Sequence, residues 1–440
     1  MNIFFASLGC DKNLVDSEKM LKLIDEAGYK IIDDESNADV IIVNTCAFIN
    51  DALEESINSI IEYGSYKEIG HLKALIVTGC LAQRYKDEIF NELPEVDAVI
   101  GTNSYPHIIE IIDDILNGNE KLSVYENLDK TVNLSKRLLS TGGFYAYLKI
   151  AEGCSKRCTY CIIPTLRGNY RSFPIEEIIE EAKELVASGV KELILVAQET
   201  TVYGVDLYGE KKLPKLLDEL QKIDNLQWIR LLYCYPEEID IELINAIKRN
   251  NKVCHYIDIP IQHSSDNILK NMGRKTDYNS LNNIIHMLRD NIPDICIRTT
   301  LITGFPGENE QDFDILTQFV KDNNFERLGV FEYSRQEGTK AYDMDNQIDD
   351  AIKIERKNKI MELQQNISKN NNQKLIGSVL EVFIEGKLTD SATYVGRTYR
   401  DAPGVDGYIF IESDTELNSG DFCKCVVTAF NEYDLIGVKQ

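Results

Sequence analysis

Positive charge, histidine and long apolar runs are all scarce in this sequence. Lys and Arg number 47 against 72 Asp and Glu, and the formal net charge is −25. That sign is wrong for a protein that follows a phosphate backbone along its length, so an extended nucleic-acid interface is disfavoured. No segment approaches the roughly 18 consecutive apolar residues of a membrane span, and Met1–Cys10 lacks the basic start and long apolar stretch of a signal peptide. We therefore expect a cytoplasmic protein with no membrane segment.

Cysteine is the residue type that stands out. The chain holds eleven cysteines and only five histidines. A secreted disulfide scaffold would usually be smaller and would pair an even number of cysteines. Metal binding is therefore the leading hypothesis for these thiols.

The sequence patterns predict an α/β protein of three domains, as a length of 440 residues also suggests. Residues 1–118 alternate apolar strands with helical periodicity, which predicts βαβ units and a parallel sheet. The polar range 119–139 is typical of a linker. Residues 140–370 repeat the strand–helix pattern, whereas residues 371–440 alternate with a period of two and predict a small antiparallel β-barrel of the oligonucleotide-fold kind.

The region 140–370 contains six candidate strands. Six strand–helix units are too few to close an eight-fold barrel, so we expect a partial (β/α)6 barrel. The candidate strands are Tyr145–Ala151, Glu192–Ala197, Trp228–Cys234, His255–Ile259, Cys296–Ile302 and Leu328–Tyr333.

The strongest chemical signal is a run of three closely spaced cysteines, Cys154, Cys158 and Cys161, placed directly after a predicted strand. Three thiolates at this spacing can hold one iron-sulfur cluster and leave one iron without a protein ligand. Zinc is the alternative, but a structural zinc site usually needs four ligands, and no Cys or His follows at zinc-finger spacing. The ligand count favours the cluster.

A second set of cysteines, Cys10, Cys46 and Cys80, follows three different apolar strands of the first domain. The carboxyl ends of parallel strands meet at one edge of a sheet, where such folds bind ligands. Taken singly, each of these thiols is more simply a buried core cysteine. Three equivalent positions nevertheless predict a second three-cysteine site.

The spacing of Cys154, Cys158 and Cys161, with the aromatic Tyr160 before the last of them, resembles the radical S-adenosylmethionine (SAM) superfamily. The resemblance implies that these cysteines hold a 4Fe-4S cluster whose open iron binds SAM. One electron then cleaves SAM to methionine and a deoxyadenosyl radical, which abstracts hydrogen from an unreactive carbon. The cofactor carries the difficult chemistry, and the protein positions the reacting carbon.

Further positions fit this resemblance as contacts for SAM, in addition to Tyr160. Gln198 and Glu199 end the second strand of the barrel and are candidates for its amino group or ribose. Arg298 is a candidate for its carboxylate, and Gly304 opens a glycine motif for packing the adenine. Each position also has an ordinary explanation, because strand ends carry polar residues and glycines form turns.

Two three-cysteine sites followed by a C-terminal barrel resemble the methylthiotransferases of this superfamily, in which the barrel is called TRAM. The resemblance implies a second 4Fe-4S cluster on the cysteines of the first domain, which presents the sulfur. It also implies a reducing electron donor such as flavodoxin or ferredoxin. A hypothesis from another class is a non-catalytic iron-sulfur electron carrier, which would need no open iron and would not cleave SAM.

The methylthiotransferases divide into enzymes that act on tRNA and a branch that acts on an aspartate of the twelfth small-subunit ribosomal protein. Residues 371–440 contain six basic and eleven acidic residues, including Asp401, Asp406 and Glu412. An RNA-binding barrel should be basic, whereas an acidic one suits a basic ribosomal protein. The segments Arg397–Gly407 and Glu432–Gly437 also resemble the ribosomal branch. We therefore expect a protein substrate, and nucleic acid is an unlikely one; modification of isopentenyladenosine beside the tRNA anticodon remains the alternative.

Overall fold

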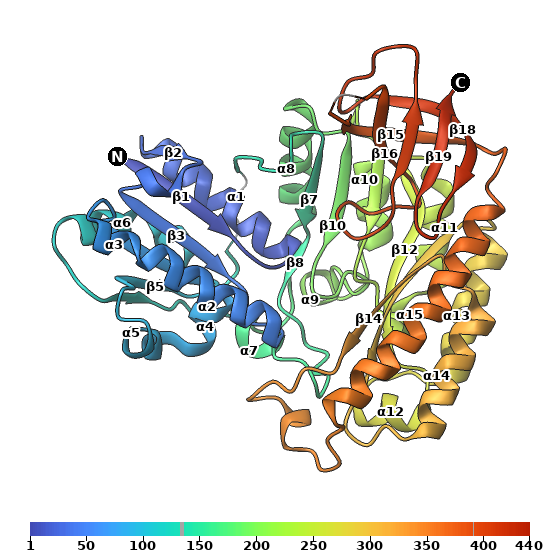
Figure 1. Cartoon of the computed structure of the whole chain (residues 1–440), viewed down its shortest axis with the longest axis horizontal. Helices are drawn as coiled ribbons and strands as arrows, with labels where there is room; N and C mark the ends of the chain where they lie inside the picture. Colours follow the sequence, from blue (N-terminus) through green and yellow to red (C-terminus); the bar gives the residue numbers. More distant parts are fainter. Residues whose placement is uncertain (133–135, 390) are drawn as a thin grey trace.

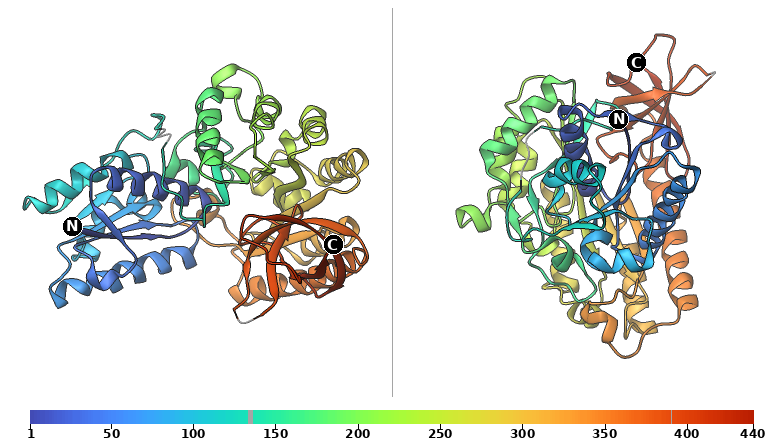
Figure 2. Two further views of the ribbon diagram at one scale, coloured as in Figure 1. Left: turned by 90° about the horizontal axis from the view of Figure 1, so that it is seen from above. Right: turned by 90° about the vertical axis from the view of Figure 1, so that its left-hand side faces the viewer.

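The computed structural model describes residues 1–132, 136–389 and 391–440. Figure 1 shows an N-terminal α/β domain on the left, a larger α/β core in the middle, and a C-terminal β-barrel at the upper right. The view from above in Figure 2 places the N-terminal domain and the barrel on different sides of the core. The core therefore contacts both of the smaller domains.

The N-terminal domain is built on a six-stranded parallel sheet with the order β2-β1-β3-β4-β5-β6. Every residue of the central strands β3 and β4 is buried, as expected for a parallel sheet covered on both faces. The strands are β1 (Asn2–Ser7), β2 (Lys30–Ile32), β3 (Val40–Thr45), β4 (Ala74–Gly79), β5 (Ala98–Ile100) and β6 (Leu122–Val124). The helices are α1 (Asp11–Glu26), α2 (Asn50–Gly64), α3 (Tyr66–Ile69), α4 (Cys80–Tyr85), α5 (Ile89–Glu92) and α6 (Ile108–Leu116).

The sixth strand lies inside the range 119–139, which the sequence predicts to be a linker. Leu122 pairs with Ala98 and Val124 with Ile100, so β6 completes the N-terminal sheet. The expectation of a linker throughout this range is therefore wrong for its first part. A three-residue strand is too short to display a hydrophobic period, which is why the pattern did not reveal it.

The core holds six parallel strands in the order β14-β13-β12-β11-β10-β7. The two edge strands do not pair with each other, so the sheet is the partial (β/α)6 barrel that the sequence predicts. Its strands are β7 (Tyr145–Lys149), β10 (Glu192–Val196), β11 (Trp228–Leu231), β12 (Val253–Gln262), β13 (Cys296–Thr303) and β14 (Arg327–Glu332), with a small hairpin of β8 (Ala151–Glu152) and β9 (Arg171–Ser172).

Helices cover the outer face of the core sheet, as Figure 1 shows. The helices of the core are α7 (Ile163–Arg167), α8 (Ile175–Ala187), α9 (Val205–Tyr208), α10 (Leu213–Leu220), α11 (Ile241–Arg249), α12 (Asp266–Asn271), α13 (Tyr278–Asn291), α14 (Glu310–Asn323) and α15 (Asp350–Gln373). Of these, α7 packs against α4 of the N-terminal domain and not on the outer face. The long helix α15 packs against β13 and β14 and leads into the C-terminal barrel. In the described parts of the chain, no helix is both long and apolar enough to cross a membrane.

The C-terminal domain is a closed five-stranded barrel with the order β15-β16-β17-β19-β18. Four of its pairings are antiparallel, as expected, and β17 with β19 is parallel. The strands are β15 (Val379–Lys387), β16 (Thr393–Thr398), β17 (Ile409–Glu412), β18 (Phe422–Phe430) and β19 (Leu435–Lys439).

The barrel covers the N-terminal ends of the core strands through buried ion pairs. Glu192, the first residue of β10, lies 2.7 Å from both Arg230 of β11 and Arg397 of β16. Burial alone would raise the pKa of Glu192, but the two guanidinium groups outweigh it and hold the pKa below its usual value. This end of the core is therefore closed by a buried ionic contact.

Two of the acidic residues expected on the barrel surface belong to this interface instead. Asp401 is buried and pairs with Arg327 at 2.5 Å, and Asp406 accepts a hydrogen bond from Tyr256 at 2.7 Å. Only Glu412 of the three is exposed. Asp401 and Asp406 therefore bind the core and cannot recruit a substrate, because a count of charges along the sequence does not show which side chains turn inward.

Candidate functional site

The cysteines of the loop triad (Cys154, Cys158 and Cys161) lie between β8 and α7, beyond the carboxyl end of β7. Gly153 has a φ of +79°, and a Cβ there would lie 2.2 Å from Asn169 O, so only glycine lets the loop pack this closely. Burial raises the pKa of the Cys154 thiol to about 11, and the neighbouring Cys158 adds to the rise. The Cys154 and Cys158 thiols are therefore close enough to interact, and a positive centre would favour the thiolate of Cys154.

The donor set of the loop triad fits an iron-sulfur cluster. Among the described residues, no three Cys, His, Asp or Glu side chains converge on a point where they could hold a single metal ion. A four-iron cluster needs a different arrangement, because each thiolate binds its own iron and the thiolate sulfurs stay apart from one another. Three thiols in one loop can bind three of the irons and leave the fourth for another ligand.

Gln198 and Glu199, which follow β10, both contact the segment that carries the loop triad. Gln198 Nε2 donates to Glu152 Oε1 at 2.7 Å, while its Oε1 is buried and has no hydrogen-bond partner among the described residues. Glu199 lies 3.4 Å from Lys156 of the loop. Burial raises the pKa of Glu199, and Lys156 opposes that rise. The structure thus brings both predicted residues to the loop.

Tyr160 and Gly304 lie on another side of the same loop. The ring of Tyr160 packs edge-on against Phe305, with centroids 6.5 Å apart, and Phe305 packs in turn against Tyr333. Gly304 has a φ of +73°, and a Cβ there would lie 2.2 Å from the side chain of Lys353. Phe305, the residue after Gly304, therefore brings the glycine motif beside Tyr160 of the cysteine loop; that Gly304 packs the adenine of SAM stays a prediction.

Arg298 has other partners than the sequence suggests. Its Nη1 donates to Asp258 Oδ1 at 2.8 Å, and its Nε lies 3.5 Å from Asp406 Oδ1 of the C-terminal barrel. Both carboxylates are largely buried, so the guanidinium is engaged at the interface between the core and the barrel. The expectation that it meets the carboxylate of SAM gains no support from this geometry.

Arg274, which the sequence analysis did not single out, carries free donors near the loop triad. Its guanidinium lies 4.3 Å from the ring centre of Tyr235, whose hydroxyl is 3.9 Å from Cys158 Sγ. Its Nε and Nη1 are buried without a hydrogen-bond partner in the described part of the chain. No local motif marks this residue, because it lies in the connection between α12 and α13 and approaches the loop only in the fold.

The sheet-edge triad (Cys10, Cys46 and Cys80) lies at the carboxyl ends of β1, β3 and β4, which are neighbours in the N-terminal sheet. A Cβ on Gly9 would lie 2.7 Å from Cys46 Cβ, so glycine is needed where the Cys10 loop passes Cys46. Burial, together with the neighbouring Cys80 and Cys10, raises the pKa of Cys46 to about 12. The fold therefore brings together three thiols that are distant in sequence.

The sheet-edge triad faces the core across a buried polar interface. Tyr233, just beyond β11, donates to Asp11 Oδ1 at 2.9 Å, and Lys12 Nζ lies 3.2 Å from the centre of the Tyr233 ring. Arg167 of α7 lies 3.7 Å from Cys80 Sγ and 3.4 Å from Glu152, the residue two before Cys154. The two triads thus lie on the two sides of one interface, with Arg167 between them.

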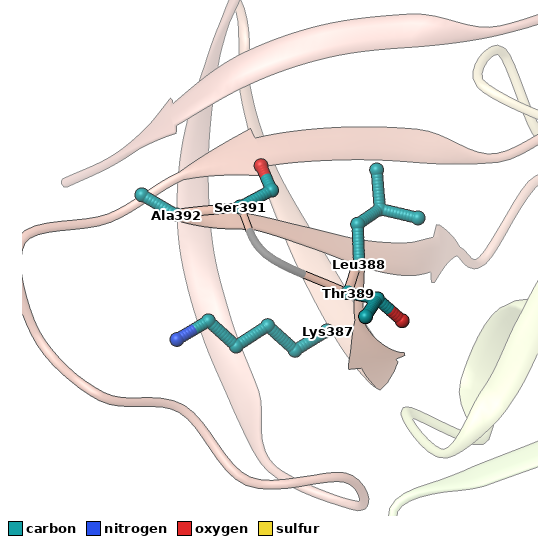
Figure 3. Close-up of a pocket in the computed structure, with 5 residues that line it drawn as sticks. All are labelled: Lys387, Leu388, Thr389, Ser391 and Ala392. Carbon is teal, nitrogen blue, oxygen red and sulfur yellow. The ribbon is translucent and has the colours of Figure 1, made fainter.

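A surface pocket at the β15–β16 hairpin of the barrel carries none of the predicted site residues. It has a volume of about 610 Å³ and is shown in Figure 3. Its lining consists of Lys387, Leu388, Thr389, Ser391 and Ala392. None of the cysteines of the two triads lines this pocket.

Known families match each of the three domains. Residues 2–101 match the uncharacterized protein family UPF0004, residues 148–320 match the radical SAM superfamily, and residues 376–439 match the TRAM domain. A radical SAM methyltransferase, TsrM from Kitasatospora setae, has a similar fold with a TM-score of 0.57 over 77% of this chain and 76% of that chain. The cobalamin-dependent SAM radical enzyme OxsB gives a TM-score of 0.55 over 83% of this chain and 56% of that chain. Both are 12% identical to this chain, so they support the fold alone.

Curated relatives match over the full length. A protein from Lachnoclostridium phytofermentans is 57% identical over 100% of both chains. One from Clostridioides difficile is 50% identical over 99% of this chain and 98% of its own. Both relatives bear the name ribosomal protein uS12 methylthiotransferase RimO. The chain therefore belongs to the radical SAM family of ribosomal protein uS12 methylthiotransferases.

Proposed function

We propose that this methylthiotransferase acts on ribosomal protein uS12 and places the methylthio group on the β-carbon of an aspartate. Two three-thiol sites on the two sides of one buried interface carry this proposal. One site suits radical formation, the other suits the presentation of sulfur, and their facing arrangement suits a substrate carbon between them. The full-length relatives named for uS12 support the choice of substrate.

The loop triad would hold a 4Fe-4S cluster that, when bound together with SAM, supplies the electron for radical formation. The residues around the loop would then bind and orient SAM. The free Nε and Nη1 of Arg274 suit its carboxylate, and the unpaired Oε1 of Gln198 suits its amino group. Tyr160 and the backbone at Gly304 would pack against the rest of the cofactor, and Glu199 would hold Lys156 in place.

The sheet-edge triad would hold a second 4Fe-4S cluster, whose open iron is the place for a sulfur ligand. Its thiols come from three adjacent strands, so the sheet itself sets their separation. Lys12 and Tyr233 stack at the side of this site that faces the core and would limit the access of water. Cys10 is exposed, whereas Cys46 and Cys80 are buried, so the substrate would approach the site from the side of Cys10.

The exposed charge of the C-terminal barrel supports a basic protein as the substrate. Arg397 and Arg400, two of the six basic residues in 371–440, are buried against the core. The fully exposed basic residues that remain are Lys374, Lys387 and Lys424, against the exposed acidic residues Glu381, Glu412, Asp414, Glu416 and Asp421. An acidic surface attracts a basic ribosomal protein and repels RNA.

We further propose that reduced flavodoxin or ferredoxin supplies the electron. The radical step consumes an electron from outside the chain, and small acidic electron carriers commonly serve iron-sulfur enzymes. A ribosomal substrate would also place the reaction in the cytoplasm. A direct check is to compare the rate of SAM cleavage with each reduced carrier and with a chemical reductant.

The decisive experiment offers two substrates to the anaerobically reconstituted, reduced enzyme in the presence of SAM. Purified uS12 and isopentenylated tRNA are incubated in parallel, and mass spectrometry scores a methylthio increment on each. We expect product on one aspartate of uS12. Product on tRNA alone would overturn the substrate assignment, and the absence of any SAM cleavage would favour an electron carrier.

A further inference from the structure

The guanidinium of Arg167 contacts one cysteine of the sheet-edge triad, Cys80, and Glu152, which lies two residues before the loop triad. Arg167 is the last residue of α7, which begins two residues after Cys161, and its side chain is 3% exposed. Its Nη2 lies 3.7 Å from Cys80 Sγ, across the interface between the core and the N-terminal domain. A residue that follows the loop triad closely in sequence therefore donates to a thiol of the sheet-edge triad.

The other contacts of Arg167 set the direction of this donor. Nη1 donates to Asp16 Oδ2 at 2.6 Å and to Glu152 Oε2 at 3.4 Å. Nη2 also donates to Asn13 Oδ1 at 2.9 Å. Because the guanidinium is planar and rigid, two carboxylates that hold one nitrogen leave the other directed toward Asn13 and the sulfur.

The charges around Arg167 balance before Cys80 is considered. Lys149 Nζ contacts both Asp16 and Glu152, so two cations face two carboxylates in a buried site. A thiolate at Cys80 would add one more negative charge. Arg167 is the cation that donates a hydrogen bond to it, and in a buried site such a bond is stronger than in water.

We propose that Arg167 tunes the cluster of the sheet-edge triad by donating an N–H···S hydrogen bond to Cys80. This inference rests on the second cluster of the proposed function. Hydrogen bonds to the sulfurs and the net charge of the surroundings set the reduction potential of an iron-sulfur cluster. A cationic donor stabilises the more negative, reduced form, so Arg167 raises the potential. It is a positioning residue, because it acts through the cysteine.

The test uses the full chain with the loop triad replaced by Ala, so that bound iron belongs to the sheet-edge triad. After anaerobic reconstitution, we expect about four iron atoms per chain. The midpoint potential is then measured by redox titration with electron paramagnetic resonance detection. Adding Arg167→Met should shift the potential to a more negative value. Arg327→Met is the matched control, because Arg327 is also buried and paired with a carboxylate, but at the interface with the C-terminal barrel; it should leave the potential unchanged.

The possible failures are distinguishable. If the variant that lacks only the loop triad binds no iron after reconstitution, there is no second cluster, and the proposed function of the sheet-edge triad is refuted. Equal potentials with and without Arg167→Met, at equal iron content, would overturn the role of Arg167 alone. If Arg167→Met does not fold or does not bind iron, Arg167→Lys is measured instead. The lysine ammonium keeps the positive charge but lacks the planar fork that directs a donor to Cys80. A more negative potential then supports the proposal, and an unchanged potential refutes it.

Discussion

The two cysteine triads are built in different ways. The loop triad belongs to one short segment, and a close backbone packing at Gly153 is its main requirement. The sheet-edge triad depends on the register of three strands and on the passage of Gly9 beside Cys46. The loop triad depends on local backbone packing, whereas the sheet-edge triad depends on the pairing of three strands in the N-terminal sheet. We therefore expect the two triads to fail independently of each other.

The largest effect is expected when the loop triad is replaced by Ala. Cleavage of SAM should be lost completely, because the open iron that binds SAM is lost with the cluster. Deoxyadenosine formation and iron content are measured on the triple variant, with far-UV circular dichroism as the control for folding. Unchanged cleavage of SAM in a folded variant would refute the assignment of the loop triad as the radical site.

Replacing the sheet-edge triad by Ala should separate the two functions. Radical formation should persist, because it requires only the loop triad, but no methylthio group should reach uS12. The measurement combines a deoxyadenosine assay with mass spectrometry of uS12, and the iron content should fall to about half. Wild-type iron content would show that these thiols are ordinary core residues, and methylthiolated product would exclude them as the site of sulfur presentation.

Breaking the interface between the N-terminal domain and the core should weaken iron binding at the sheet-edge triad more than at the loop triad. Asp16→Ala leaves Arg167 and Lys149 buried without one of their carboxylates, which typically costs about 3–5 kcal/mol of unfolding free energy. We expect a lower urea midpoint and earlier loss of iron from the sheet-edge triad.

The matched control for Asp16→Ala is Glu355→Ala, which removes an exposed pair with Lys359 on α15. Exposed pairs contribute about 0–1 kcal/mol, so the urea midpoint should hardly change. Equal midpoints for the two variants would contradict the importance of the buried network.

The smallest effect concerns recruitment of the substrate. Reversing Glu412, Asp414 and Glu416 to Lys should slow association with uS12 a few-fold, and added salt should mimic the change because exposed charges are screened within about 8–10 Å. Stopped-flow binding measures the association rate. Reversal of exposed Asp290, Asp314 and Asp322, which belong to α13 and α14 of the core and not to the barrel, is the control. A similar loss of rate in both variants would indicate a general charge effect and not a docking surface on the barrel.

Strands long enough to carry a pattern were predictable from the sequence. The expected strand Glu192–Ala197 corresponds to β10 (Glu192–Val196), whereas the expected Trp228–Cys234 overruns β11 (Trp228–Leu231) and the expected His255–Ile259 falls short of β12 (Val253–Gln262) at both ends. The three-residue strands β2, β5 and β6 were not predictable, because so short a segment displays no period and depends on its neighbours for pairing. The position of the C-terminal barrel on the core could not be predicted either, because the contacts between them join residues far apart in the chain.

The sequence by itself determined the loop triad, since eight consecutive residues are enough to bring Cys154, Cys158 and Cys161 together. It also indicated the sheet-edge triad, because the carboxyl ends of parallel strands share an edge. Only the tertiary structure decided which charges meet: Arg167 with Cys80, Arg298 with Asp258, and Arg327 with Asp401. A charged side chain takes its partner from whatever group the fold buries beside it, and that neighbour is set by packing between domains and not by local spacing.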